Sequence, residues 1–186
     1  MTININQISS GMGLLINNDV FLVNEYHHVK PGKGSAFVRV KLRNVKTGAV
    51  IERTFKTADK LEDIPLEENE LEYLYHSGDA FCFMDHTTYE QISLSEEEVG
   101  DAVKFLLENL TVTGMICEGK VLKVILPNFI VATIAETEPG VRGDSSKAGT
   151  KPAKIETGTT IQVPLFINLD DTVRIDTRTG QYVERV

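Results

Sequence analysis

The chain has 186 residues, of which 41% are hydrophobic and 25% are charged, and this composition is typical of a folded globular protein rather than a disordered or fibrous one. No apolar run approaches the roughly 20 residues of a membrane-spanning helix, and residues 1–7 lack the positive charge and apolar stretch of a signal peptide. We therefore expect a cytoplasmic protein without a membrane partner.

The charge of the chain changes sign along the sequence. The net charge of −8 argues against a nucleic-acid partner, because phosphate binding depends on basic side chains. Residues 27–60, however, contain nine Lys or Arg and two acidic residues, whereas residues 61–103 contain thirteen acidic residues and no Lys or Arg. This change indicates a boundary between two modules, of which only the first is suited to a polyanion. Two faces of one domain would also be consistent with it.

Short β-branched and aromatic runs make up most of the chain, separated by Gly, Pro, Asn and Asp, which predicts an all-β protein built from small antiparallel barrels. The clearest strands are predicted at residues 19–23, 36–42, 80–84, 120–126 and 160–167. Basic and apolar residues alternate along residues 36–42, so this strand buries one side and presents basic groups on the other. The basic face holds Phe37, Arg39 and Lys41, and the apolar face holds Val38, Val40 and Leu42. Residues 44–48 then form a turn that ends at Gly48.

One helix is predicted at residues 96–109. Ser95 is placed to cap it, with Glu98 completing a capping box. Its buried stripe is expected to hold Val99, Val103, Leu106, Leu107 and Leu110. Pro65 and Pro127 lie near the expected junctions, which divide the chain into three small domains at residues 1–63, 64–128 and 129–186.

The segment between the first two predicted strands should be a hairpin loop whose tip is Lys33. Pro31 restricts φ at the first turn position, and Gly32 and Gly34 tolerate conformations closed to other residues, so nothing bulky surrounds this lysine. A solvated turn lysine without a binding function would occur in the same glycine-rich sequence. A phosphate-binding P-loop fails because its longer glycine spacing and following helix are absent. A Schiff-base lysine would need a desolvated amine, and an exposed tip provides the opposite.

Two stretches of the chain resemble bacterial translation elongation factor P. They are KPGKGSAFVRVKLRNVKTG at residues 30–48 and GTKPAKIETGTTIQVPLFINLDDTVRIDTRTGQYVERV at residues 149–186. The resemblance implies one KOW/SH3-like barrel followed by two OB-fold barrels, in an elongated arrangement similar to a tRNA. It also implies a monomeric, non-enzymatic factor that binds the ribosome between the P and E sites, beside the P-site tRNA, and relieves stalling at consecutive prolines.

On this resemblance, Lys33 is the modification site, extended by a β-lysyl-type group that a lysine-modifying enzyme attaches. The matching loop comprises Lys30, Pro31, Gly32, Lys33 and Gly34, and Arg39, Lys41 and Arg43 are expected to contact RNA phosphates nearby. A second loop resembles the one that reaches the E-site mRNA codon. It contains Arg142, Gly143, Asp144 and Ser145, and Ser145 replaces the Thr that is commoner in the family.

Other functions are less well supported by the residues. An OB-type protein that binds single-stranded nucleic acid away from the ribosome is the alternative, although the chain has no Trp and few aromatic residues among its basic ones. His27 and His28 fit either RNA contact or ordinary exposure at a strand end. Cys82, Asp85 and His86 lack zinc-like spacing, so neither a metal site nor another cofactor is expected. Cys82 and Cys117 are expected to be reduced core thiols.

Overall fold

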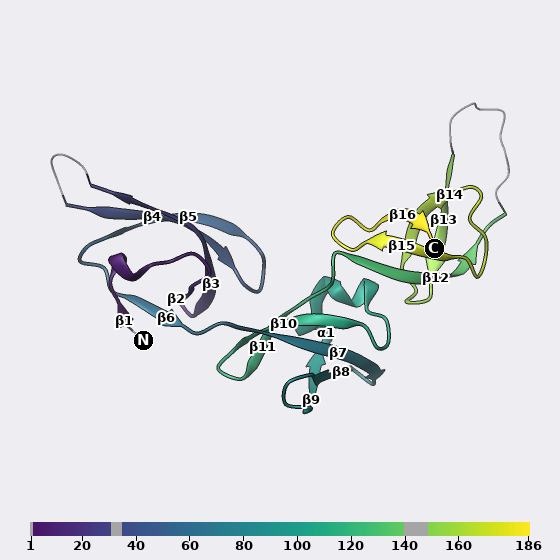
Figure 1. Ribbon diagram of the computed structural model, residues 1–186, viewed down its shortest axis with the longest axis horizontal. Coiled ribbons are helices and arrows are strands. Elements are labelled where there is room, and N and C mark those ends of the chain that lie inside the picture. The colour runs from purple at the N-terminus through teal and green to yellow at the C-terminus, as the bar shows by residue number, and fades with distance from the viewer. Residues whose placement is uncertain (1, 31–34, 140–148) are drawn as a thin grey trace. The chain divides into compact units, whose positions relative to one another are not determined.

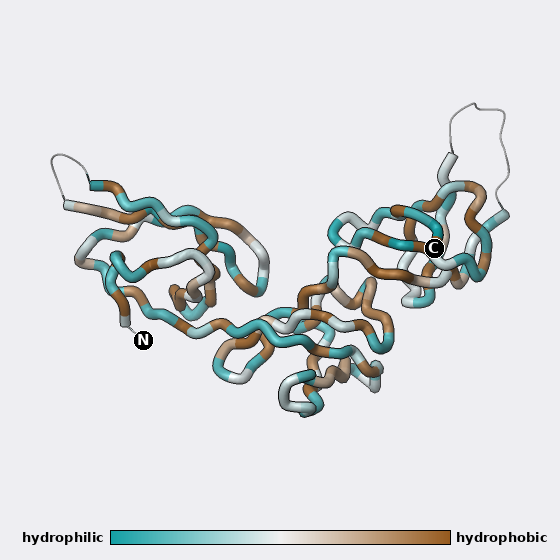
Figure 2. The backbone as a smooth tube through the Cα atoms, viewed as in Figure 1, coloured by the Kyte–Doolittle hydropathy of each residue, from teal (hydrophilic) through white to brown (hydrophobic). Residues whose placement is uncertain are grey.

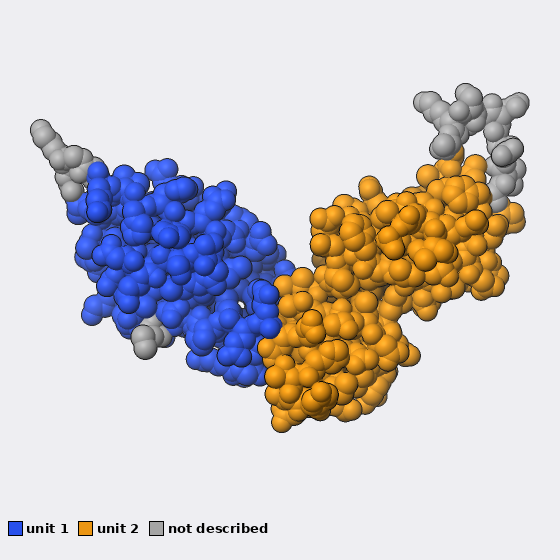
Figure 3. Space-filling view, viewed as in Figure 1, with its two compact units in different colours: residues 1–68, 115–123 blue, residues 69–114, 124–186 orange. Residues whose placement is uncertain are grey.

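The computed structural model describes residues 2–30, 35–139 and 149–186, and this part of the chain contains three antiparallel sheets (Figure 1). They belong to two compact units, one formed by residues 1–68 and 115–123 and the other by residues 69–114 and 124–186 (Figure 3). The prediction of a mostly β fold is confirmed. The predicted division at residues 63 and 128 stays a prediction.

The first sheet has six strands in the order β1-β6-β2-β3-β4-β5. Its elements are β1 (Thr2–Ile3), the 3₁₀ helix η1 (Ile5–Gln7), β2 (Gly13–Ile16), β3 (Asp19–Val29), β4 (Phe37–Asn44), β5 (Val50–Lys56) and β6 (Leu61–Ile64). The predicted alternation in β4 is confirmed, since the side chains of its inward residues are fully buried and its basic residues are exposed. Apolar and polar segments accordingly alternate along the strands in Figure 2. The predicted turn is also present, with Gly48 at φ +74°.

The second and third sheets have the same strand order, as expected for two OB-type domains. In each sheet the first of five strands is central, the second and third lie on one side, and the fourth and fifth lie on the other. The second sheet contains β7 (Glu67–Ser77), β8 (Ala80–Asp85), β9 (Gln91–Ser95), β10 (Thr111–Cys117) and β11 (Lys120–Ile125). The third contains β12 (Phe129–Thr137), β13 (Thr150–Ile155), β14 (Thr160–Pro164), β15 (Thr172–Asp176) and β16 (Gln181–Arg185).

The predicted helix is shorter than its apolar spacing indicated. The capping box is present, with the Ser95 amide donating to Glu98 Oε2 at 2.8 Å, but α1 covers only Glu96–Val99. Gly100 follows at φ +61°, ψ −140°, a conformation outside the helical region, so the α-helix ends there. A 3₁₀ helix, η2 (Gly100–Phe105), continues the segment, and the prediction of helix as far as residue 109 was wrong.

Helix η2 joins the second sheet to the core of the third, within the second compact unit. Phe105 belongs to the apolar cluster of the third sheet, whose members include Ile134, Ile155 and Ile175. The hydroxyl groups that follow β13 reinforce this contact, since Thr157 Oγ1 and Thr159 Oγ1 each donate to the Lys104 carbonyl at 2.7 Å. Among the residues described, no helix has the length and apolar character needed to cross a membrane.

Candidate nucleic-acid interface

The hairpin of β3 and β4 carries the glycine-rich loop that the sequence singled out. Its two strands remain paired as far as Val29 and Phe37, and a β-bulge lies between Val23 and Glu25. Beyond this bulge β3 pairs only with β4, because β2 pairs with the first part of β3, residues 19–22. The loop is therefore borne by strands that are paired up to its base.

The predicted tip, Lys33, lies outside the described residues, as do Pro31, Gly32 and Gly34. Lys30 is the last described residue before them and is exposed. The position of Lys33 at the tip of the loop therefore stays a prediction.

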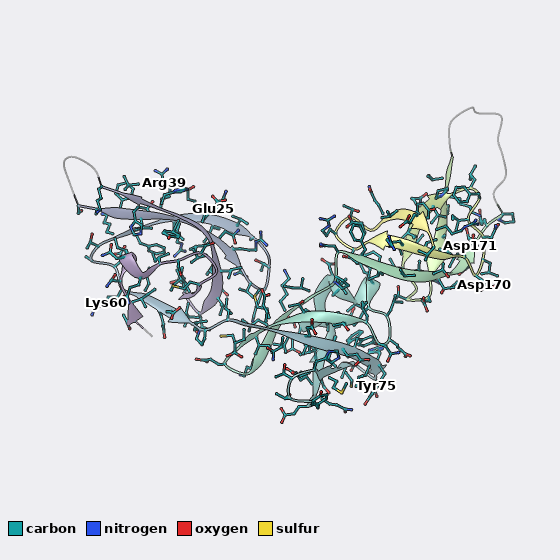
Figure 4. The ribbon with its side chains drawn as sticks, in the orientation of Figure 1. Glu25, Arg39, Lys60, Tyr75, Asp170 and Asp171 are labelled. Atoms are coloured by element: carbon teal, nitrogen blue, oxygen red, sulfur yellow. The ribbon has the colours of Figure 1, made fainter. Side chains whose placement is uncertain are left out.

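The basic face of the hairpin is partly neutralised by glutamates from neighbouring strands. Arg39 Nε lies 3.3 Å from Glu52 Oε1, and Lys41 Nζ lies 3.6 Å from Glu25 Oε2. Figure 4 shows Glu25 and Arg39 on the same side of the sheet. Exposed ion pairs of this kind contribute about 0–1 kcal/mol, so a phosphate can compete for either cation. Arg43 is exposed and makes no ion pair with any residue that the structure describes.

The opposite face of the same hairpin carries the aromatic side chains of Tyr26 and His28. Of these two, only His28 was considered as an RNA contact from the sequence. The rings of Tyr26 and His28 are perpendicular, with centroids 5.6 Å apart, and Tyr26 is 38% exposed. Their partners in the register are Val40 and Val38, whose side chains are fully buried. The sequence signal for this pair was the spacing of two residues, which places both rings on one face of a strand.

The second predicted site is a loop between β12 and β13. Arg142, Gly143, Asp144 and Ser145 lie outside the described residues. The ends of the loop are nevertheless tied together, because Thr137 Oγ1 donates to the Pro152 carbonyl at 3.2 Å and Lys151 Nζ donates to the Glu138 carbonyl at 2.6 Å. Lys151 is only 6% exposed, although it carries a charged side chain.

The acidic second sheet contains one buried carboxylate among the described residues. Asp85 is 2% exposed and accepts hydrogen bonds from Asn69 Nδ2 at 2.8 Å and from the amides of Thr87 and Thr88 at 2.7 and 3.0 Å. The hydrogen bond from Asn69, together with those from the backbone, lowers the pKa of Asp85 although burial opposes the shift. Its role is to hold the turn after β8 in place.

Cys82 and His86, two residues of types that can bind a metal ion, each lie beside another side chain. Cys82 Sγ lies 3.8 Å from Ser93 Oγ, and His86 Nε2 lies 3.1 Å from Glu72 Oε2. Across the described ranges, no group of three His, Cys, Asp or Glu side chains is placed to hold a metal ion. Cys82 and Cys117 are free and buried, as expected, and burial raises the pKa of Cys117.

Two exposed phenylalanines, Phe129 at the start of β12 and Phe166 in the turn after β14, each lie beside an arginine. Arg178 lies over the ring of Phe129, and Arg185 over that of Phe166, each at 5.9 Å from the ring centroid. Both guanidinium groups also lie near carboxylates: Arg178 Nη2 is 2.6 Å from Asp176 Oδ2, and Arg185 Nη1 is 3.8 Å from Asp171 Oδ2, just before β15. This surface is aromatic but has little uncompensated positive charge.

Comparison with known proteins gives matches along the whole chain. Three family descriptions match: the Elongation factor P KOW-like domain at residues 4–61, the Elongation factor P OB domain at residues 66–124, and Elongation factor P, C-terminal, at residues 130–185. Solved structures also share the fold. A eukaryotic translation initiation factor 5A from Methanococcus jannaschii covers 67% of this chain and 94% of its own, with 23% identity and a TM-score of 0.50. A protein of the same kind from Naegleria fowleri has 18% identity and a TM-score of 0.53 and also covers 67% of this chain, and 95% of its own.

Curated relatives are closer in sequence. Elongation factor P of a Thermoanaerobacter species is 52% identical over 176 residues, which cover 95% of each chain. The protein of the same name from Desulfitobacterium hafniense is 49% identical over 180 residues, 97% of each chain. Identity of this extent over nearly the full length, together with the three family descriptions that match successive parts of the chain, shows that the chain belongs to the elongation factor P family.

Proposed function

We propose that this chain acts on the ribosome in the cytoplasm, beside P-site peptidyl-tRNA, and stimulates peptide-bond formation at consecutive prolines. Membership of the elongation factor P family is the observation that carries the proposal. The β3–β4 hairpin supports it, because this hairpin holds the glycine-rich loop within the basic segment, residues 27–60. Lys33, extended by a β-lysyl-type group from a separate modifying enzyme, is the arm that reaches the reacting end of the tRNA.

The proposed action is positional rather than enzymatic. Proline reacts slowly as both acceptor and donor, and an arm that holds the end of the peptidyl-tRNA in a reactive geometry raises the rate without a nucleophile or proton transfer on the factor. The amino groups of an extended Lys33 provide charge-assisted hydrogen bonds to phosphate and ribose oxygens. Lys30 and Arg43 are exposed and free of ion pairs with described residues, and they suit contacts to nearby phosphates. Arg39 and Lys41 can join them once their glutamates are displaced.

The second contact in this proposal is the loop between β12 and β13. Arg142, Gly143, Asp144 and Ser145 lie in this loop, and we assign them to the mRNA codon in the E site. The hydrogen bond of Lys151 to Glu138 supports a defined base for this loop, because it joins the two strands where the loop begins and ends. Ser145 retains the hydroxyl of the commoner Thr and lacks its methyl group.

A reconstituted translation system tests the proposal. The modified protein should accelerate synthesis through a Pro-Pro-Pro sequence, and Lys33→Ala should lower that rate about tenfold or more, because the positioning arm is lost. Lys46→Ala is the matched control, since Lys46 is an exposed turn lysine of the same compact unit and should leave the acceleration unchanged. Absence of acceleration by the modified wild-type protein would refute the proposal.

Binding of single-stranded nucleic acid away from the ribosome is the second candidate. The exposed Phe129 and Phe166 favour it, because OB-type surfaces stack bases on aromatic rings. The arginines over these rings are paired with aspartates, which weakens attraction for phosphate. Salt-sensitive binding to free oligonucleotides, without cosedimentation with ribosomes, would support this function in place of the first.

A further inference from the structure

A cleft in the second compact unit is lined by parts of the second sheet, the η2 segment and the third sheet. Its volume of about 760 Å³ lies within the range of ligand sites, about 300–1,000 Å³. Its apolar lining includes Phe81, Leu106 and Val131, and its charged lining consists of Glu96, Glu108 and Glu156. No lysine or arginine that the structure describes lines it, so the cleft is suited to a cation with an apolar body.

The elements around the cleft are tied to one another by hydrogen bonds. Thr157 belongs to the lining, and its Oγ1 donates to the Lys104 carbonyl at 2.7 Å. The Tyr73 amide donates to the Leu110 carbonyl at 3.0 Å, and the Asn109 amide donates to the Tyr73 carbonyl at 2.7 Å. Because the walls are held in place before a ligand arrives, binding costs little ordering of the protein.

The phenol of Tyr73 is a polar group of the cleft that the fold leaves without a partner. Tyr73 is 5% exposed, and its ring lies 6.2 Å from that of Phe81 and 5.4 Å from that of Phe83, measured between centroids. Its hydroxyl makes no hydrogen bond with a described residue, although a buried tyrosine hydroxyl usually finds one. Across the described ranges, no fully buried side-chain nitrogen or oxygen lacks a partner, so this hydroxyl reaches solvent, and it does so in the cleft that Tyr73 lines.

The carboxylates of the cleft are hydrogen-bond acceptors that also have room for a donor. Glu96 and Glu108 make no side-chain hydrogen bond or ion pair within the described part of the chain. Glu156 accepts the Thr133 amide at 2.8 Å through Oε1, which leaves its second oxygen available. Burial and then the negative charge of Glu108 raise the pKa of Tyr73, so this carboxylate acts on the phenol. An arginine side chain, with five N–H donors and no acceptor, matches such a set of acceptors.

An aromatic stack in the lining favours a planar cation. The rings of His76 and Phe81 are stacked, with centroids 4.3 Å apart and 21° between their planes, and His76 is exposed. A guanidinium group stacks on such rings and pairs with a carboxylate through two hydrogen bonds, which a lysine ammonium cannot do. A nucleic acid is disfavoured here, because the carboxylates repel phosphate groups.

We propose that this cleft binds a basic segment of a partner protein that inserts an arginine side chain. The guanidinium donates to the Glu108 carboxylate and the Tyr73 hydroxyl and stacks on His76, and apolar neighbours of the arginine cover Leu106 and Val131. A segment is favoured over a small free cation because a cation alone would leave this apolar lining uncovered. The proposal goes beyond the proposed function, which assigns RNA contacts to two loops and no partner to this cleft.

A titration of the full-length, ¹⁵N-labelled protein with capped peptides, followed by amide chemical shifts, tests the proposal. The probe is acetyl-Gly-Leu-Arg-Leu-Gly-amide, and it should shift the amides of Leu107, Val131 and Thr157, which line the cleft. The same peptide with uncharged citrulline in place of arginine should bind about tenfold more weakly, because its charged hydrogen bonds are lost. The lysine peptide should bind more weakly than the arginine peptide, because it lacks the planar group.

Two variants test the named contacts. Tyr73→Phe should weaken binding of the arginine peptide about 2- to 10-fold, yet its urea midpoint should be no lower than that of wild type, since the hydroxyl has no partner in the fold. Glu108→Gln should weaken binding about 2- to 5-fold. Glu108 is exposed, so this variant keeps the test intact even if Tyr73→Phe fails to fold. Glu90→Gln makes the same change of net charge outside the cleft in the same unit and should leave Kd within about twofold of wild type.

Several outcomes would overturn the proposal. Equal binding of the arginine and citrulline peptides would show that the cleft does not recognise a cation, and equal binding of the lysine peptide would remove the role of the guanidinium. If Glu90→Gln weakened binding as much as Glu108→Gln, the attraction would be that of an acidic surface and not of this cleft. Unchanged binding by both Tyr73→Phe and Glu108→Gln would refute the site. None of these results bears on the proposed function, because the titration contains no ribosome.

Discussion

Asp85 belongs to the acidic segment of the chain, but its carboxylate is buried and stabilises the turn after β8. It is the buried carboxylate of the described chain, and its hydrogen bonds from Asn69 and the Thr87 and Thr88 amides stabilise its ionised form. These hydrogen bonds lower its pKa in the folded state. A carboxyl whose pKa is lower when folded stabilises the fold fully above its unfolded pKa of about 3.9, and this contribution is lost as pH falls through the folded pKa.

Asp85→Asn is therefore expected to destabilise the protein in a pH-dependent way. At pH 7 the free energy of unfolding should fall by about 1–3 kcal/mol, because charge-assisted hydrogen bonds to a buried group are lost. The difference from wild type should shrink as pH falls below about 4. Urea unfolding at pH 7, 4 and 3 measures both effects, with the exposed Asp79→Asn of the β7–β8 turn as control, expected within about 0.5 kcal/mol of wild type. An equal loss at every pH would contradict this account.

Strands were predicted more accurately than the helix, for a physical reason. Alternation in β4 reports directly which side chains are buried, so the predicted faces of residues 36–42 were confirmed. The apolar spacing at residues 96–110 is compatible with a helix, yet Gly100 ends α1 after one turn. Gly100 adopts φ +61° and ψ −140°, and only the folded context of η2 and Phe105 shows that the chain needs this conformation.

The contacts of the basic side chains on the β3–β4 hairpin could not be predicted from the sequence. The charge pattern identified the basic hairpin, but the partners of Arg39 and Lys41 lie on neighbouring strands, and their register depends on the bulge after Val23. The same bulge decides which face Tyr26 occupies. Loop lengths and bulges are tertiary features that a residue pattern specifies weakly.

Gly100→Ala tests the interpretation of the helix end. An L-residue is strained at this φ and ψ, so the free energy of unfolding should fall by roughly 1–3 kcal/mol. Ser95→Ala, which removes only the helix cap, should cost about 1 kcal/mol and provides the comparison. Thermal unfolding followed by circular dichroism measures both. If Gly100→Ala proved as stable as wild type, the glycine conformation would not be what ends α1.

The two loops that the proposed function assigns to the ribosome belong to different compact units of the chain. The hairpin loop with Lys33 lies in the first unit, and the loop with Arg142 lies in the second. In the proposed function these loops do different work, because Lys33 acts where the peptide bond forms and Arg142 only holds the factor on the ribosome. An interaction made in the transition state changes the maximal rate, whereas a uniform binding contact changes the concentration needed for half-maximal effect.

Varying the protein concentration in a Pro-Pro-Pro translation assay should separate these roles. Lys33→Ala should lower the plateau rate about tenfold or more and should leave it low at saturation. Arg142→Gln should raise the half-maximal concentration about tenfold, the loss expected for one charged hydrogen bond, and should reach the wild-type plateau. Because the two residues lie in separate units, the double variant should show both changes at their single-variant sizes. A lowered plateau for Arg142→Gln would mean that the second loop also positions the tRNA for reaction.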